Sequence, residues 1–64
     1  MANKLPELRK RQKLTQAQLA EKAGVSRSVI ARFEAGINQM SPRNLQKVCK
    51  VLHCKMDDIM KEVN

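Results

Sequence analysis

A connection of only three residues separates two helical patterns in this chain, and it constrains the fold more than any other feature. The first pattern begins at Thr15 and stops at Gly24, and the second begins at Ser26 and runs to about Ala35. Glycine adopts a left-handed conformation without a Cβ penalty, and serine is a preferred N-cap. So short a connection crosses the two helices sharply instead of laying them antiparallel. The pattern therefore predicts a helix-turn-helix over residues 15–34.

The spacing inside this motif is more informative than any single residue. Thr15 and Gln18 have the form of a capping box, which sets the start of the earlier helix. Ala20 is small enough to lie where the two helices touch, Gly24 supplies the turn, and Ile30 provides an apolar anchor. These residue types are common alone, but together at this spacing they indicate the motif strongly.

Three further helices are predicted around the motif. The first covers about residues 4–13 and is weakly amphipathic. The next starts at Ser41–Pro42, because proline is tolerated at the first helical position, and it carries a full apolar stripe. His53 is expected to end that helix in a left-handed conformation. The last helix covers about residues 56–63, and the residues expected to face inward on it are Ile59, Met60 and Val63.

Charge narrows the classes of partner. The chain has 13 Lys and Arg against 6 Asp and Glu, which gives a net charge of +7 in 64 residues. Such an excess attracts anions, most commonly nucleic acid, although ribosomal or membrane-surface binding gives the same balance. There is no apolar run of membrane-spanning length, and the N-terminus lacks the apolar core of a signal peptide. We therefore expect a cytoplasmic protein that makes no use of a membrane.

The two cysteines, Cys49 and Cys54, are expected to be reduced. Together with His53 they resemble a partial set of metal ligands, but a structural zinc needs four and the chain has no other Cys or His. We therefore expect no metal and no cofactor. The sequence also has no glycine-rich phosphate loop and no nucleophile paired with a base by a motif, so neither an enzyme nor a small-molecule site is expected.

The later helix of the motif has one apolar and one polar side. Ile30 and Phe33 belong to the apolar side, whereas Arg27, Ser28 and Arg32 lie opposite. In a DNA-binding helix-turn-helix this helix enters the major groove, where the arginine fork pairs with O6 and N7 of guanine. We predict that these three polar residues read bases. The alternative is a solvated face whose charges serve solubility.

Other polar residues are candidates for phosphate contacts. Gln16 lies at the N-terminus of a helix, where free N–H groups bind anions. For Gln16, plain solvent exposure is the alternative. Asn38 and Arg43 lie around the loop before the fourth helix, where they could hold the backbone of the other strand, and for Arg43 the alternative is simple exposure in the first turn of a helix. Arg9 and Glu34 fit either a partly buried ion pair or two independent surface charges, and the residues alone do not decide between them.

Two segments, LRKRQKLTQAQLAEKAGVSRSVIARFEAG and SPRNLQKVCKVLHCKMDDIM, resemble the Cro/CI-type (XRE-like) helix-turn-helix family of phage repressors and bacterial regulators. The resemblance implies an all-α, five-helix domain of the lambda-repressor type over residues 4–60, followed by a tail at 61–64. One departure is Lys55, a poor N-cap for the last helix. By position in the family, Gln16 and Ser26 correspond to phosphate contacts, Arg27, Ser28 and Arg32 to base readers, Arg43 to a residue near the minor groove, and Arg9 and Glu34 to an interhelical ion pair.

The function that this resemblance implies is sequence-specific binding to double-stranded operator DNA. We expect a repressor that acts as a homodimer on a pseudo-palindromic site. The alternative is a protein-interaction module, antitoxin-like or co-activator-like, built on the same fold. That alternative requires an apolar patch on the outside, for which the candidates are Met40, Met56, Met60 and Val63.

Overall fold

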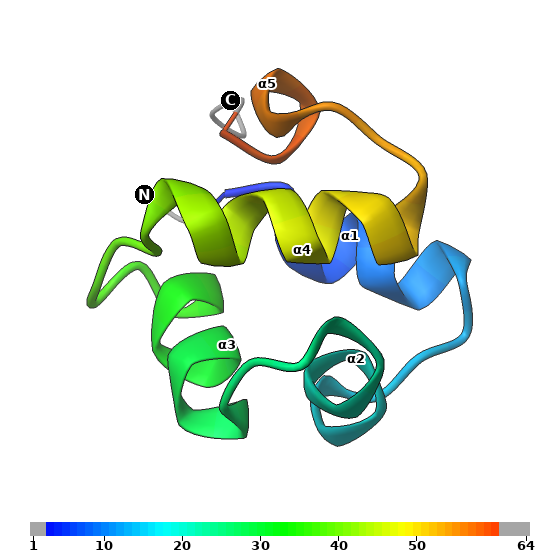
Figure 1. Cartoon of the computed structure of the whole chain (residues 1–64), viewed down its shortest axis with the longest axis horizontal. Helices are drawn as coiled ribbons and strands as arrows, with labels where there is room; N and C mark the ends of the chain where they lie inside the picture. The colour runs from blue at the N-terminus through cyan, green and yellow to red at the C-terminus, as the bar shows by residue number, and fades with distance from the viewer. Residues whose placement is uncertain (1–2, 61–64) are drawn as a thin grey trace.

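Five helices make up residues 3–60, the part of the chain that the computed structural model describes. Figure 1 shows α4 across the middle of the molecule, with α2 and α3 on one side of it and α5 on the other. Helix α2 packs against α3 and α4, and α5 packs against α4 and α1. The predicted all-α, five-helix fold is confirmed. The helices are α1 (Leu5–Arg11), α2 (Gln16–Ala23), α3 (Arg27–Glu34), α4 (Pro42–Leu52) and α5 (Met56–Met60).

Side-chain caps set the starts of two helices as the sequence predicted. The Thr15 hydroxyl accepts a hydrogen bond from the N–H of Gln18 at 3.0 Å, and the Gln18 side chain accepts one from the N–H of Thr15 at 2.9 Å. Ser41 accepts from the N–H of Asn44 at 3.2 Å, and Pro42 occupies the first helical position of α4. Each cap satisfies backbone donors that a helix start otherwise leaves free.

Helices α1 to α4 all end in the same backbone motif. A residue with positive φ follows the last turn, and the N–H of the next residue returns to the carbonyl five positions earlier. These bonds span 2.9–3.2 Å and define the Schellman motif. The prediction for His53 is confirmed, since its φ is 54°. The residues with positive φ are Lys13, Gly24, Gly36 and His53.

Helix α1 is shorter than predicted, because it ends at Arg11 and not at Lys13. Lys13 has a φ of 59°, so it turns the chain instead of continuing the helix. The N–H of Leu14 bonds to the carbonyl of Arg9 at 3.2 Å, and the Arg9 guanidinium donates to the Leu14 carbonyl at 2.7 Å. These two bonds pull Leu14 back over the helix end, where it packs against the core.

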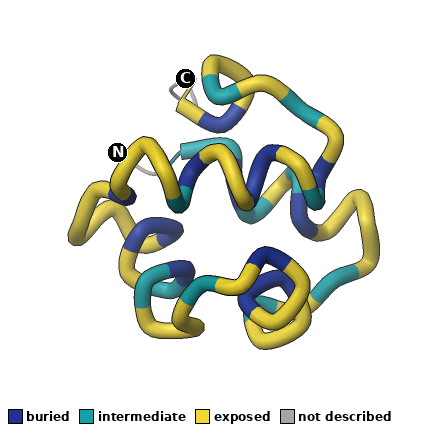
Figure 2. Tube along the Cα trace, in the orientation of Figure 1, coloured by how far each residue is buried: buried dark blue, intermediate teal, exposed yellow. Residues whose placement is uncertain are grey.

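The core is aliphatic and lies between the helices. Figure 2 shows the buried segments on the inward side of each helix. Phe33, the single aromatic residue of the chain, is 3% exposed. Within residues 3–60, no helix combines the length and the apolar character needed to cross a bilayer. The largest fully buried side chains are Leu5, Leu19, Ile30, Val48 and Ile59.

Helix α5 differs from the prediction at Met60. Ile59 is fully buried as expected, but Met60 is 47% exposed, so the prediction that it faces inward is wrong. Adjacent residues on an α-helix point about 100° apart, so the burial of Ile59 turns Met60 toward solvent. At the start of α5 the N–H of Lys55 donates to the Asp58 carboxylate at 3.0 Å, whereas the Lys55 side chain has no acceptor with which to cap the helix. Val63 and the tail at 61–64 lie outside the described residues.

The two cysteines are free thiols within the Schellman motif that ends α4. Cys54 N–H donates to the Cys49 carbonyl at 3.1 Å, which places the two residues where this motif usually has an apolar contact. Burial and the neighbouring Cys49 thiol raise the pKa of Cys54 to about 11. The thiol form is therefore favoured. Within residues 3–60, no group of three or more His, Cys, Asp or Glu side chains is placed to hold a metal ion.

Slow alkylation of Cys54 is the expected chemical consequence. At pH 8 the shift in pKa from 9.0 to about 11 lowers the thiolate fraction about a hundredfold. In the wild-type chain, iodoacetamide should therefore label Cys54 about a hundredfold more slowly in the folded state than in urea, as followed by mass spectrometry of the peptide that carries Cys54. Equal rates in the two states would contradict the assigned shift.

Candidate nucleic-acid interface

The turn between α2 and α3 fixes how the two helices cross. Gly24 has a φ of 70°, and a Cβ placed there would meet no atom within 4 Å. The backbone conformation, and not lack of space, therefore requires glycine at this position. Ser26 caps α3 by accepting a hydrogen bond from the N–H of Val29 at 3.2 Å. Ala20 is 5% exposed on α2, and the two helices are in contact, as the predicted motif requires.

Helix α3 presents its polar side to solvent. Ile30 is fully buried and Phe33 is nearly so, and these two residues anchor the helix in the core. Arg27, Ser28 and Arg32 are all exposed, so the three predicted base readers are available on the surface. The side chains nearest to the start of the helix are the ones that a major groove would meet first.

A buried ion pair joins α1 to the end of α3. Arg9 Nε donates to Glu34 Oε2 at 2.7 Å, and Arg9 Nη2 donates to Glu34 Oε1 at 3.0 Å. The exposed fractions of the two side chains are 11% and 6%. The hydrogen bond to Glu34 raises the pKa of Arg9 above its usual value, and the opposing effect of burial is smaller. Of the two alternatives that the sequence left open, the structure shows the ion pair.

Gln16 belongs to the same network. Its side-chain amide donates to Glu34 Oε1 at 3.0 Å, so the first residue of α2 is linked to the last residue of α3. Among residues 3–60, the backbone N–H groups of Gln16 and Ala17 have no hydrogen-bond acceptor. Such groups at a helix start attract anions. The Glu34 carboxylate thus holds the Gln16 side chain beside a ready phosphate site.

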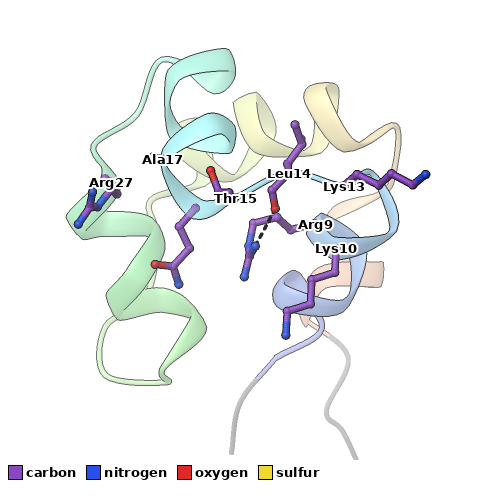
Figure 3. Close-up of a pocket in the computed structure, with 8 residues that line it drawn as sticks. Arg9, Lys10, Lys13, Leu14, Thr15, Ala17 and Arg27 are labelled. Atoms are coloured by element: carbon purple, nitrogen blue, oxygen red, sulfur yellow. Dashed lines mark hydrogen bonds between the residues drawn. The ribbon is translucent and has the colours of Figure 1, made fainter.

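A basic hollow of about 470 Å³ opens in front of this helix start (Figure 3). The end of α1, the turn after it and the start of α2 form its walls, and Arg27 of α3 closes one side. All of its charged lining residues are cations. Its position beside α3 suits a phosphate group of the same DNA duplex. The lining residues are Arg9, Lys10, Lys13, Leu14, Thr15, Gln16, Ala17 and Arg27.

Lys10 and Lys13 are the charged residues lining this hollow for which the sequence predicted no role. They are visible in the sequence as part of a basic strip, but nothing in it shows which helix start the strip faces. The left-handed conformation of Lys13 brings the chain around to α2. Lysine is rarely expected at a position with positive φ, so this signal was too weak to find from the sequence.

The remaining predicted phosphate contacts lie at the two ends of α3 and at the start of α4. The N–H of Asn38 bonds to the carbonyl of Arg32 at 3.4 Å, which holds the exposed Asn38 against the helix end. Arg43 is exposed in the first turn of α4. Ser26 is exposed at the start of α3, where its hydroxyl is already engaged as the cap. These three predicted contacts thus lie at the start of α3, in the loop after it and in the first turn of α4.

Comparison with known proteins identifies the family. The model of the helix-turn-helix family HTH_3 matches residues 6–59. The chain belongs to this helix-turn-helix family. Another helix-turn-helix protein, YgzD of Bacillus subtilis strain 168, is described as an uncharacterized HTH-type transcriptional regulator. It is 39% identical over 59 residues, which are 92% of this chain and 89% of YgzD.

Solved structures of SinR share the helix-turn-helix fold of this chain. The N-terminal DNA binding domain of SinR from Bacillus subtilis has a TM-score of 0.85 at 30% identity, with 92% of this chain and 87% of that chain covered. SinR in complex with DNA has a TM-score of 0.79 at 31% identity, with 83% and 86% covered. In the SinR/SinI complex the TM-score is 0.86 at 30% identity over 92% of this chain, which spans 58% of the matched chain. The family and fold are those of DNA-binding transcriptional regulators of the Cro/CI (XRE-like) type.

Proposed function

We propose that this chain is a sequence-specific DNA-binding regulator that inserts α3 into the major groove of an operator. The exposure of Arg27, Ser28 and Arg32 on a helix anchored by Ile30 and Phe33 carries this proposal. An arginine in the groove pairs with O6 and N7 of guanine. A serine hydroxyl can either donate a hydrogen bond to a base or accept one from it. The role is binding and not catalysis, no cofactor takes part, and the place of action is the cytoplasm, where operator DNA lies.

Phosphate contacts would set the position of α3 on the duplex. Lys10, Lys13, Gln16, Ala17 and Arg27 all line the basic hollow. Figure 3 shows Arg27 at one end of it and Lys13 at the other, with the Lys13 side chain pointing outward. Asn38 extends the contact line past the other end of α3. Contacts of this kind fix register and orientation, whereas base contacts specify sequence. The duplex would therefore be held on both sides of the reading helix.

A homodimer fits the short length of the reading helix. Helix α3 has eight residues, of which three are exposed and polar at predicted reading positions. One copy can discriminate only a few base pairs, so two copies on half-sites about 10 base pairs apart would give an operator of useful specificity. Such a dimer binds a pseudo-palindrome and represses by occupying it.

The alternative of a protein-interaction module finds less support in the surface. Met40 is buried and Met56 is partly buried against the core, so these two residues do not form an outer patch. Within residues 3–60 the large exposed hydrophobic side chains are Ile37, in the loop between α3 and α4, and Met60, in α5.

Salt separates the two functions experimentally. Binding to a labelled duplex should weaken about 10³-fold or more between 50 and 200 mM salt if six or more phosphates are contacted. Binding through an apolar surface should change little over this range. Fluorescence anisotropy with duplexes drawn from a random pool measures both affinity and slope. Weak binding whose affinity depends neither on the salt concentration nor on the DNA sequence would contradict the proposed function.

Replacing Lys13 with alanine should weaken binding to cognate and random duplexes by the same factor. Lys13 lines the hollow and carries no base-reading role in this account. The slope of log affinity against log salt should become less steep by about 1. Lys50→Ala on α4 is the matched control, since Lys50 is exposed but does not line the hollow. A loss confined to the cognate duplex would instead assign Lys13 to base recognition.

A further inference from the structure

Asn3 joins the start of α1 to the end of α3. Its side-chain N–H donates to the Phe33 carbonyl at 2.7 Å, across 30 residues of sequence. Its side-chain oxygen accepts from the N–H of Leu5 at 3.0 Å. Lys4, the residue at the N-cap of α1, makes no side-chain cap, so Asn3 supplies the acceptor that this helix start needs. One carboxamide therefore serves two helices at once.

Only a short amide makes both bonds together. An aspartate has the same shape and accepts from Leu5, but an ionised carboxylate has no proton to donate to a carbonyl. A serine hydroxyl is too short to span both partners. The donor half of the Asn3 side chain, which engages Phe33, is thus separable by substitution from the acceptor half, which engages Leu5.

Two contacts hold the segment next to Asn3 in place. The N–H of Lys4 donates to the carbonyl of Ile59 at 2.9 Å, which ties the same segment to α5. Leu5, the next residue, is fully buried. Asn3 is therefore positioned by its contacts with α1 and by the adjacent bond to α5. Its bond to the Phe33 carbonyl then positions the end of α3 relative to these two helices.

We propose that Asn3 is a positioning residue for DNA recognition, which sets the orientation of α3 through its bond to Phe33. This inference rests on the proposed function of α3. The start of α3 is fixed by the Ser26 cap, and its end is fixed by Asn3 at Phe33 and by Arg9 at Glu34. Contacts at both ends restrict the tilt of this eight-residue helix. Release of the Phe33 carbonyl frees one side of the end while the ion pair remains, so the exposed reading side chains no longer meet the bases in a single orientation.

Three substitutions at Asn3 separate positioning from capping. Asn3→Asp and Asn3→Ser keep an acceptor for Leu5 and lose the donor to Phe33, and the serine variant adds no charge. Asn3→Ala loses both bonds. The readout is the ratio of affinities for a duplex selected by the wild type and a random duplex, measured at one salt concentration well below the melting temperature. This ratio should fall about three- to tenfold in all three variants, whereas the melting temperature should fall most in Asn3→Ala.

Partial unfolding cannot mimic this result, because it lowers the active fraction on both duplexes and leaves the ratio unchanged. If the ratio stays at the wild-type value in Asn3→Asp and Asn3→Ser, Asn3 is an ordinary cap of α1 and the inference is wrong. If the wild type itself does not discriminate between the duplexes, the proposed function fails before the variants are compared. The two failures are therefore distinguishable.

Discussion

Replacement of Arg9 by methionine should lower the free energy of unfolding by about 3–5 kcal/mol, because the buried Glu34 carboxylate then loses its partner. Glu34 is 6% exposed at the side chain and accepts both bonds of the Arg9 fork. Arg9 also holds the Leu14 carbonyl at 2.7 Å, so the variant leaves a second acceptor unsatisfied. A 64-residue domain has little stability in reserve. Urea denaturation followed by circular dichroism measures the change.

Two further variants make this prediction specific to burial. Arg11→Met removes an exposed arginine whose nearest carboxylate, Glu7, lies 3.8 Å away, and it should change stability by less than about 0.5 kcal/mol. The double variant Arg9→Met, Glu34→Leu removes the uncompensated charge and should recover much of the loss. If Arg9→Met is no more destabilising than Arg11→Met, the ion pair does not hold α1 to α3.

Replacing either Arg27 or Arg32 with alanine should cost about 1–3 kcal/mol on the cognate duplex, or roughly 5- to 150-fold in affinity. Both side chains are exposed on α3, so their removal leaves the core intact. Affinity for random duplexes should fall much less, since only a general electrostatic contribution is lost there. Anisotropy titrations on both duplexes measure the difference.

Arg11→Ala is the matched control for charge, because it removes an exposed arginine from α1 and not from α3. It should leave the ratio between cognate and random affinities unchanged. If Arg27→Ala and Arg32→Ala weaken both duplexes equally, the two arginines contact phosphates and do not read bases.

Local signals in the sequence predicted the helix starts and the turn well. The capping box at Thr15, the Ser26 and Ser41 caps and the left-handed Gly24 depend on residues a few positions apart, so their chemistry is visible in the sequence. His53 was predictable for the same reason. The exposed side of α3 followed from its apolar stripe. These features determine the surface that faces DNA in the proposed function.

Specific contacts that no residue preference indicates account for what the sequence did not predict. The turn at Lys13 depends on two hydrogen bonds between Arg9 and Leu14. One joins their backbones, and the other runs from the Arg9 side chain to the Leu14 carbonyl. No residue preference predicts this turn. The bond of Asn3 to Phe33 spans 30 residues and was not predicted. Met60 was expected to be buried because it continues an apolar pattern, but Ile59 takes the inward side of the helix and the adjacent Met60 points away from it. Which residues contact each other across the fold depends on the tertiary structure and cannot be predicted from neighbouring residues.

Selection of bound duplexes from a random DNA pool tests the central claim most directly, because that claim is that the exposed side of α3 reads sequence. The wild type should enrich a pseudo-palindromic site with guanines at fixed positions in each half, about 10 base pairs apart. Selection with Arg27→Ala should relax the preference at one of those positions and leave the spacing unchanged. Enrichment of the same sequence by both proteins, or of no sequence by the wild type, would contradict the claim.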